Sequence, residues 1–138
     1  MPLQTVTRML DAVRDRRVET VVDCFDPGPD TYVFLEGPRW ANRGGESIRR
    51  GWRAYFRAPI RLRSWSWHEG PLVHESGDLA VVAGMVDCDF EAGGAPRPLR
   101  MRMTWGQARN AGVWRIVHEH GSQPHADPYG TGDWLPAA

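Results

Sequence analysis

Apolar residues recur at helical spacing in the first half of the chain, in residues 3–13, 18–25 and 45–56. Intervals of three and four residues place these side chains on one face of a helix, so we expect three amphipathic helices. Pro59 ends the third of them. Between the second and the third, residues 31–35 (TYVFL) are β-branched and aromatic, which predicts a strand.

From residue 60 onward the pattern favours strands alone. The segments are rich in β-branched and aromatic residues, and Gly, Pro, Asn and Asp separate them. The expected strands are residues 60–68, 72–75, 79–90, 97–108 and 113–121. Helices followed by a meander of strands predict an α+β fold.

The chain of 138 residues is long enough for one domain with a real core, which we expect over residues 1–122. Residues 123–138 are rich in Pro, Gly and Asp and have no periodic pattern, so we expect an extended tail there.

Charge and composition exclude several partners. The 17 basic and 17 acidic residues give a net charge of zero, so we expect no binding to nucleic acid or to an anionic membrane. No apolar run resembles a signal peptide or a membrane span, and we expect a cytoplasmic protein. Cys24 and Cys88 lack metal-ligand spacing, so we expect structural thiols, no metal site and no cofactor.

The last expected strand carries both polar and apolar residues on each of its faces. Regular alternation would place Trp114, Ile116, His118 and His120 on one face. The other face would carry Arg115, Val117 and Glu119. A strand that is mixed on both faces predicts a sheet that is covered on both sides.

The order of these elements resembles the nuclear transport factor 2-like superfamily, especially the SnoaL-like bacterial proteins and the association domain of calcium/calmodulin-dependent kinase II. Residues 90–97 are similar to the hairpin of that association domain, and residues 114–120 to its terminal strand. The resemblance implies a curved antiparallel sheet that wraps around three helices and forms a conical pocket. It leaves function open, because the superfamily includes isomerases, cyclases, dehydratases, transport factors and assembly domains.

Ketosteroid isomerases resemble the opening part of the chain. Their general-base aspartate falls near Glu36, their oxyanion-hole acid near Thr104 and their oxyanion-hole tyrosine near Met9. Two of the three groups are therefore missing or weakened, and ketosteroid isomerase activity itself is not expected.

The resemblance also suggests which strand faces line the pocket. Arginines in the cavity of the association domain correspond to Met85, Trp105 and Gly121, so its carboxylate-binding pocket is not expected here. The inward-facing set would be Val81, Ala83, Met85, Asp87, Leu99, Met101, Met103, Trp105, Val117, Glu119 and Gly121.

Asp87 and Glu119 would then be two carboxyls in a wall of Met and Trp. Apolar surroundings raise the pKa of a carboxyl toward the range that suits proton transfer, so the two are candidate catalytic acid and base. Alternatively each lies at the pocket mouth or pairs with an arginine such as Arg115 or Arg63. Glu36 is an alternative base, or else a solvated loop acid.

The remaining candidates bind substrate or a second chain. The expected substrate-binding residues are Tyr55, Trp67, Met85, Met103 and Trp105. Trp114, His118 and His120 are expected on the outer face of the sheet, as the interface of a homodimer.

Two functions remain open. The first is a cofactor-free isomerase, cyclase, dehydratase or hydrolase that acts by general acid-base catalysis on a small apolar substrate bearing a carbonyl or epoxide. The second is a non-catalytic domain for ligand binding or oligomeric assembly.

Overall fold

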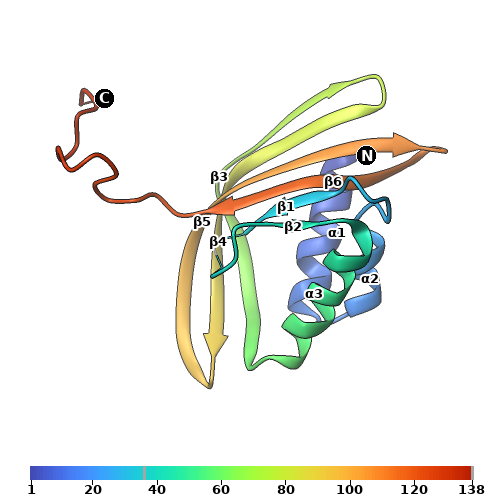
Figure 1. Cartoon of the computed structure of the whole chain (residues 1–138), viewed down its shortest axis with the longest axis horizontal. Helices are drawn as coiled ribbons and strands as arrows, with labels where there is room; N and C mark the ends of the chain where they lie inside the picture. Colours follow the sequence, from blue (N-terminus) through green and yellow to red (C-terminus); the bar gives the residue numbers. More distant parts are fainter. Residues whose placement is uncertain (36, 138) are drawn as a thin grey trace.

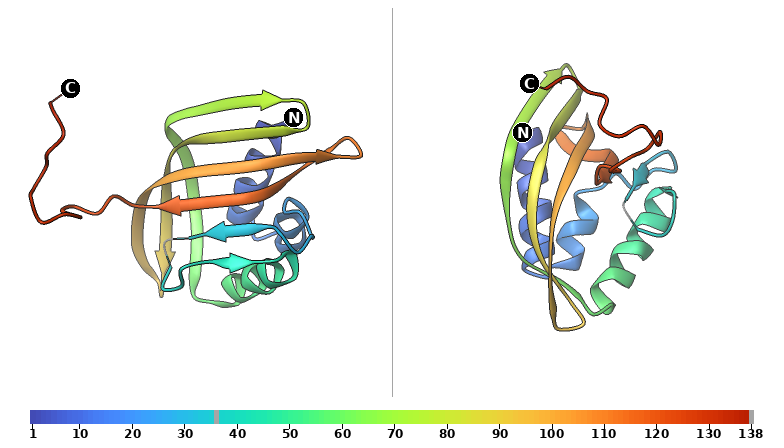
Figure 2. Two further views of the ribbon diagram at one scale, coloured as in Figure 1. Left: turned by 45° about the horizontal axis from the view of Figure 1, so that its top comes forward. Right: turned by 90° about the vertical axis from the view of Figure 1, so that its left-hand side faces the viewer.

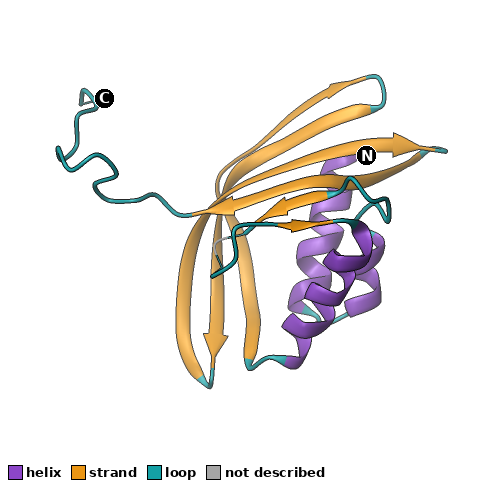
Figure 3. Cartoon of the chain, in the orientation of Figure 1, coloured by secondary structure: helices purple, strands orange, loops and turns teal. Residues whose placement is uncertain are grey.

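The computed structural model describes residues 1–35 and 37–137 (Figure 1). Helices α1 (Pro2–Arg14), α2 (Val18–Asp23) and α3 (Gly45–Arg57) correspond to the three predicted helices. All three lie on one side of a curved sheet, which Figures 2 and 3 show from several directions. Among the described residues, no helix is long and apolar enough to cross a membrane.

The sheet has six strands in the order β2-β1-β6-β5-β4-β3 and does not close into a barrel. The strands are β1 (Tyr32–Phe34), β2 (Asn42–Arg43), β3 (Ile60–Ser76), β4 (Leu79–Ala92), β5 (Ala95–Asn110) and β6 (Val113–Ser122). Neighbours run antiparallel except β1 and β6, which are parallel. The protein is therefore an α+β fold, as predicted. Two of the predicted strands form the single strand β3, and β2 was not predicted.

The core lies between the helices and the inner face of the sheet. Val6, Met9 and Val13 come from the apolar face of α1, and Val82 and Trp105 come from the sheet. All five are almost completely buried. The apolar stripe of α1 thus holds the helix against the sheet, because burying it removes a contiguous apolar surface from water.

A β-bulge changes the facing of β6 halfway along its length. Ile116 pairs with Gln107 and His118 pairs with Gly106, so Val117 is an extra residue on β6. Trp114 and Ile116 face the helices before the bulge, and Glu119 does so after it. His118 and His120 therefore lie on the outer face. The prediction that both histidines share a face with Trp114 and Ile116 was wrong.

The facing of β4 also differs from the prediction. Val86 pairs with Met101, and both are buried on the inner face. Asp87 pairs with Arg100, which puts both on the outer face, because directly opposite residues of an antiparallel pair share a face. On β5 the predicted facing is confirmed, since Met101, Met103 and Trp105 are buried.

The chain leaves the sheet after Ser122 and runs away from it (Figure 1). Every residue from 123 to 137 is exposed. The boundary of the folded domain at residue 122 stays a prediction.

Candidate functional site

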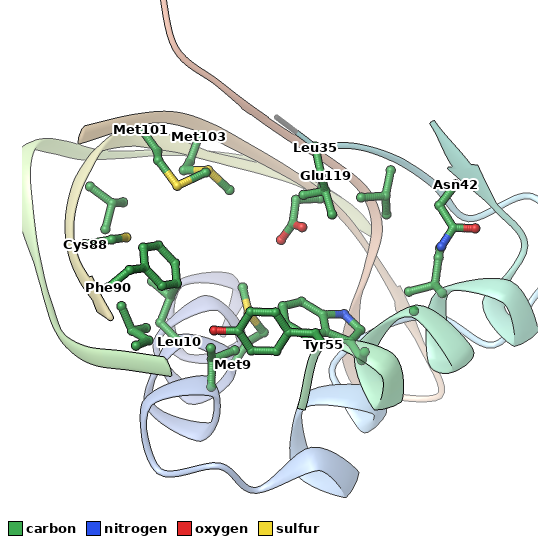
Figure 4. A pocket seen from close by; sticks show the side chains of 17 residues that line it. Met9, Leu10, Leu35, Asn42, Tyr55, Cys88, Phe90, Met101, Met103 and Glu119 are labelled. Atoms are coloured by element: carbon green, nitrogen blue, oxygen red, sulfur yellow. The ribbon is translucent and has the colours of Figure 1, made fainter. Parts of the chain in front are cut away.

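A cavity of about 220 Å³ lies between the helices and the inner face of the sheet (Figure 4). Its wall is mostly apolar, and several elements contribute to it. Apolar lining residues are Met9, Leu10, Val86, Phe90, Met101 and Met103. A concave, mostly apolar space with a few polar groups is the usual form of a small-molecule site.

Glu119 supplies a carboxyl to this cavity from β6. Its side chain points from the sheet into the cavity (Figure 4), and the residue is only 2% exposed. Trp105 lies directly opposite on β5, and its indole Nε1 donates a hydrogen bond of 2.7 Å to Glu119 Oε2. This bond orients the carboxyl and stabilises its charged form.

Tyr55 supplies a hydroxyl from α3, on the side of the cavity opposite the sheet (Figure 4). This hydroxyl is buried and has no hydrogen-bond partner among the described residues. Burial raises the pKa of Tyr55 to about 12, and the nearby positive charge of Arg16 opposes this only in part. The hydroxyl therefore stays protonated at neutral pH and can donate a hydrogen bond to a bound molecule.

The most exposed lining residues mark the entrance to the cavity. Leu35 is 45% exposed, Gly51 is exposed and Asn42 is half-buried. Asn42 is held by Ser47, because its Nδ2 donates to the Ser47 carbonyl at 3.2 Å and its Oδ1 accepts from the Ser47 hydroxyl. A Cβ at position 51 would lie 3.1 Å from Asn42 Nδ2, so a glycine there lets α3 approach β2 closely. The entrance thus lies between α3 and the β1–β2 edge.

Asp87, the other predicted catalytic carboxyl, is not in this cavity. Its side chain is 41% exposed on the outer face, where Arg100 Nε donates to Oδ1 at 2.7 Å. The hydrogen bond from Arg100 holds the pKa of Asp87 below its ordinary value. The structure does not bring Asp87 and Glu119 together, and Asp87 belongs to the ion pair that the sequence left open as its alternative.

The predicted substrate-binding residues divide into two groups. Tyr55 and Met103 line the cavity, and Trp105 lies behind Glu119 as its hydrogen-bond donor. Trp67 packs edge-to-face on Trp105, with ring centroids 6.0 Å apart, and is not among the lining residues. Met85 shares the outward facing of Asp87, which makes it a wrong prediction for the wall.

Glu36, the alternative base, lies outside the described residues. Among the residues that the structure does describe, no group of three or more His, Cys, Asp and Glu side chains is placed to hold a metal ion.

The predicted interface residues also separate. Trp114 is buried within the single chain at 8% exposure, and the Arg109 guanidinium covers its ring at 5.1 Å. It is therefore not available to a partner. His118 and His120 lie on the outer face, edge-on to Phe34 at centroid distances of 5.2 and 5.5 Å.

Cys88 and Phe90 line the cavity and were missed by the sequence analysis. Both follow from the facing of Val86, because alternate residues of a strand share a face. Pairing β4 with the correctly oriented β5 would have found them, since Val86 lies opposite Met101.

The family model for the SnoaL-like domain matches residues 3–126. The protein therefore belongs to the SnoaL-like family. Comparison with curated proteins gave no match.

Solved structures show the same fold. A nuclear transport factor 2-like protein of unknown function from Pseudomonas putida is 24% identical, with a TM-score of 0.74 over 96% of this chain and 92% of that one. A ketosteroid isomerase-like protein from Erwinia carotovora is 15% identical, with a TM-score of 0.73 over 87% of this chain and 91% of that one. A putative calcium/calmodulin-dependent kinase II association domain from Thiobacillus denitrificans is 20% identical, with a TM-score of 0.72 over 91% of this chain and 96% of that one. At these identities the likeness shows the fold alone.

Proposed function

We propose that the protein is a small-molecule enzyme in which Glu119 transfers a proton to and from an apolar substrate held in the cavity. One observation carries this proposal. The buried carboxyl of Glu119 and the buried hydroxyl of Tyr55 face one apolar cavity from opposite sides (Figure 4), and the hydroxyl has no hydrogen-bond partner among the described residues. A carboxylate in an apolar, water-poor site is a stronger base toward a bound carbon acid than the same group in water.

The arrangement suits proton transfer next to a carbonyl group. The Tyr55 hydroxyl donates a hydrogen bond to the substrate oxygen, and the Glu119 carboxylate removes a proton from the adjacent carbon. The electron pair of the broken C–H bond moves to the carbonyl oxygen as an enolate, which the Tyr55 hydrogen bond stabilises. In a β,γ-unsaturated ketone the enolate is conjugated with the C=C bond, so return of the proton from Glu119 to the γ carbon shifts that double bond and completes an isomerisation, whereas return to the same carbon regenerates the substrate.

The surrounding side chains support this chemistry in two ways. Trp105 fixes the orientation of the base through its 2.7 Å hydrogen bond to Glu119. Met101 and Met103 keep water away from the same region, and each is at most 9% exposed. Low solvent access strengthens the hydrogen bond from Tyr55 to the enolate oxygen.

Isotope exchange tests the proposal without knowledge of the natural substrate. The protein is incubated in D2O with simple cyclic ketones, and NMR follows the loss of the protons next to the carbonyl. Deuterium replaces them when the proton on Glu119 exchanges with D2O through the entrance before it returns to the carbon. We expect Glu119→Gln to lower the catalysed exchange by roughly 100-fold or more, the usual contribution of a general base. Asp87→Asn is the matched control, because it removes the same charge on the outer face. Exchange that Glu119→Gln leaves unchanged would disprove the role of Glu119.

A non-catalytic binding or assembly domain is the second candidate. The favouring observation is the exposed aromatic group on the outer face, where Tyr32 and Phe34 lie beside His118 and His120. We propose this face as the contact surface of a homodimer, compatible with either function. Saturable ligand binding with no isotope exchange for any bound ketone would favour the binding domain.

A further inference from the structure

We infer that the cavity selects neutral compounds with a single ring and a carbonyl group, and that it excludes both carboxylates and four-ring ligands. The catalytic consequence of this selectivity rests on the proposed function, whereas the selectivity itself concerns binding alone.

The size of the cavity sets the first limit. A dry engineered cavity of about 150 Å³ is filled by benzene. The present cavity of about 220 Å³ therefore holds one ring with a short substituent. Its deep wall includes Met9 and Val86, which are 2% and 0% exposed and belong to the packed core. A packed core does not expand to take in three further rings, and a four-ring ligand would leave their apolar surface in water outside the entrance.

Charge sets the second limit. None of the described residues that line the cavity is Arg, Lys or His. A bound carboxylate would share an apolar space with the carboxyl of Glu119 and would find no cationic side chain among the described lining residues, which strongly disfavours one of the two charges. Arg16 is not among the residues that line the cavity, and the carbonyl oxygens of Phe56 and Ile60 hold its guanidinium in place outside it.

The polar groups of the cavity set the third limit. Tyr55 has a hydrogen to donate and no partner for it among the described residues, so an acceptor such as a carbonyl oxygen satisfies it. Asn42 at the entrance is already bonded to Ser47 through both ends of its amide. One neutral acceptor near Tyr55 is thus the polar feature that this site recognises.

Binding of two probes of similar size and one larger probe tests the inference. Acetophenone is neutral, benzoate is its anionic counterpart, and a four-ring steroid enone tests size. Isothermal titration calorimetry at neutral pH is expected to show acetophenone binding, with benzoate at least about tenfold weaker because of the like charge. No heat of binding is expected for the steroid.

Two variants show whether Glu119 causes the discrimination. Glu119→Gln should raise the affinity for benzoate by about tenfold and leave that for acetophenone nearly unchanged, since it removes the opposing charge. Asp87→Asn changes the net charge equally and should alter neither. Should Glu119→Gln fail to fold, Tyr55→Phe provides a second measure, because it should weaken acetophenone and leave toluene, which has no acceptor, unaffected.

Several results would overturn the inference. They are benzoate or the steroid binding at least as tightly as acetophenone, no binding of acetophenone, or an equal gain for benzoate in Asp87→Asn. Selective binding of acetophenone without isotope exchange would instead uphold the inference and reject only the proposed proton transfer.

Discussion

Trp105 and Glu119 form a cross-strand pair in which the indole Nε1 donates to the carboxylate Oε2 at 2.7 Å. Both side chains are almost completely buried, at 0% and 2% exposure. A buried carboxylate is tolerated in an apolar core only where hydrogen bonds compensate for its lost hydration. The tryptophan is therefore a positioning residue, which holds the carboxyl in the orientation that Figure 4 shows.

Trp105→Phe tests this relationship. It keeps an aromatic ring and removes the N–H donor, so we expect a loss of about 1–3 kcal/mol in the free energy of unfolding and slower isotope exchange. Urea denaturation measures the first effect and NMR the second. Trp65→Phe is the control, because Trp65 Nε1 donates at 3.0 Å to Asp11, whose side chain is 33% exposed. A larger loss in the control would contradict the importance of the Trp105 bond.

Tyr55→Phe should separate activity from stability. The variant removes a buried hydroxyl without a partner among the described residues, so the free energy of unfolding should stay level or rise by about 1 kcal/mol. The rate of exchange should fall by roughly 10- to 100-fold, since the enolate loses its donor. Tyr129→Phe, at an exposed position in the tail, should change neither quantity. A marked loss of stability in Tyr55→Phe would show that the hydroxyl has a structural role.

Alkaline pH should destabilise the protein through its buried acids. Burial raises the pKa of Cys24 from 9.0 to about 11 and that of Tyr55 from 10.0 to about 12. At a pH between the ordinary and the raised pKa of each group, the folded state keeps the proton and the unfolded chain has lost it. Their contribution to stability is thus complete below pH 9 and decreases as the pH rises toward 11 and 12.

Urea denaturation at pH 8, 9 and 10 measures this dependence. Each group lowers the free energy of unfolding by at most about 1.4 kcal/mol per pH unit within its range. Cys24→Ala should make the decline between pH 9 and 10 shallower, whatever its effect on absolute stability. An unchanged slope in this variant would show that Cys24 ionises equally in both states.

The outer face should carry the contact between two chains. Phe34→Asp places a charge among Tyr32, His118 and His120 and should lower the mass measured by light scattering from dimer to monomer. His125→Asp, in the exposed tail, is the control. A monomeric parent protein, or a dimer that Phe34→Asp does not disturb, would exclude this surface.

The helices could be predicted because their apolar residues alone define a period, and α1 buries the face that this period marks. Strand facing was harder, because it depends on pairing partners. A single extra residue, Val117, breaks the alternation of β6, and its pairing with β5 is not encoded in the local pattern. β2 has only Asn42 and Arg43, too short for a periodic signal.

The candidate site was predicted only in part, because its residues also depend on which way each strand faces. Glu119 and Met103 were expected in the cavity and line it. The resemblance to the association domain implied that Asp87 faces the cavity. The pairing of Asp87 with Arg100 instead places the acid in an outward ion pair.

The bulge at Val117 decides which chemistry β6 offers to the cavity. With regular alternation from Trp114 onward, the same residues would direct the imidazoles of His118 and His120 inward and the carboxyl of Glu119 into solvent. A single strand sequence thus encodes either an acidic or an imidazole-lined interior, and the position of one unpaired residue selects between them. Relatives that gain or lose a residue along this strand can therefore exchange their reactive group without substituting any side chain.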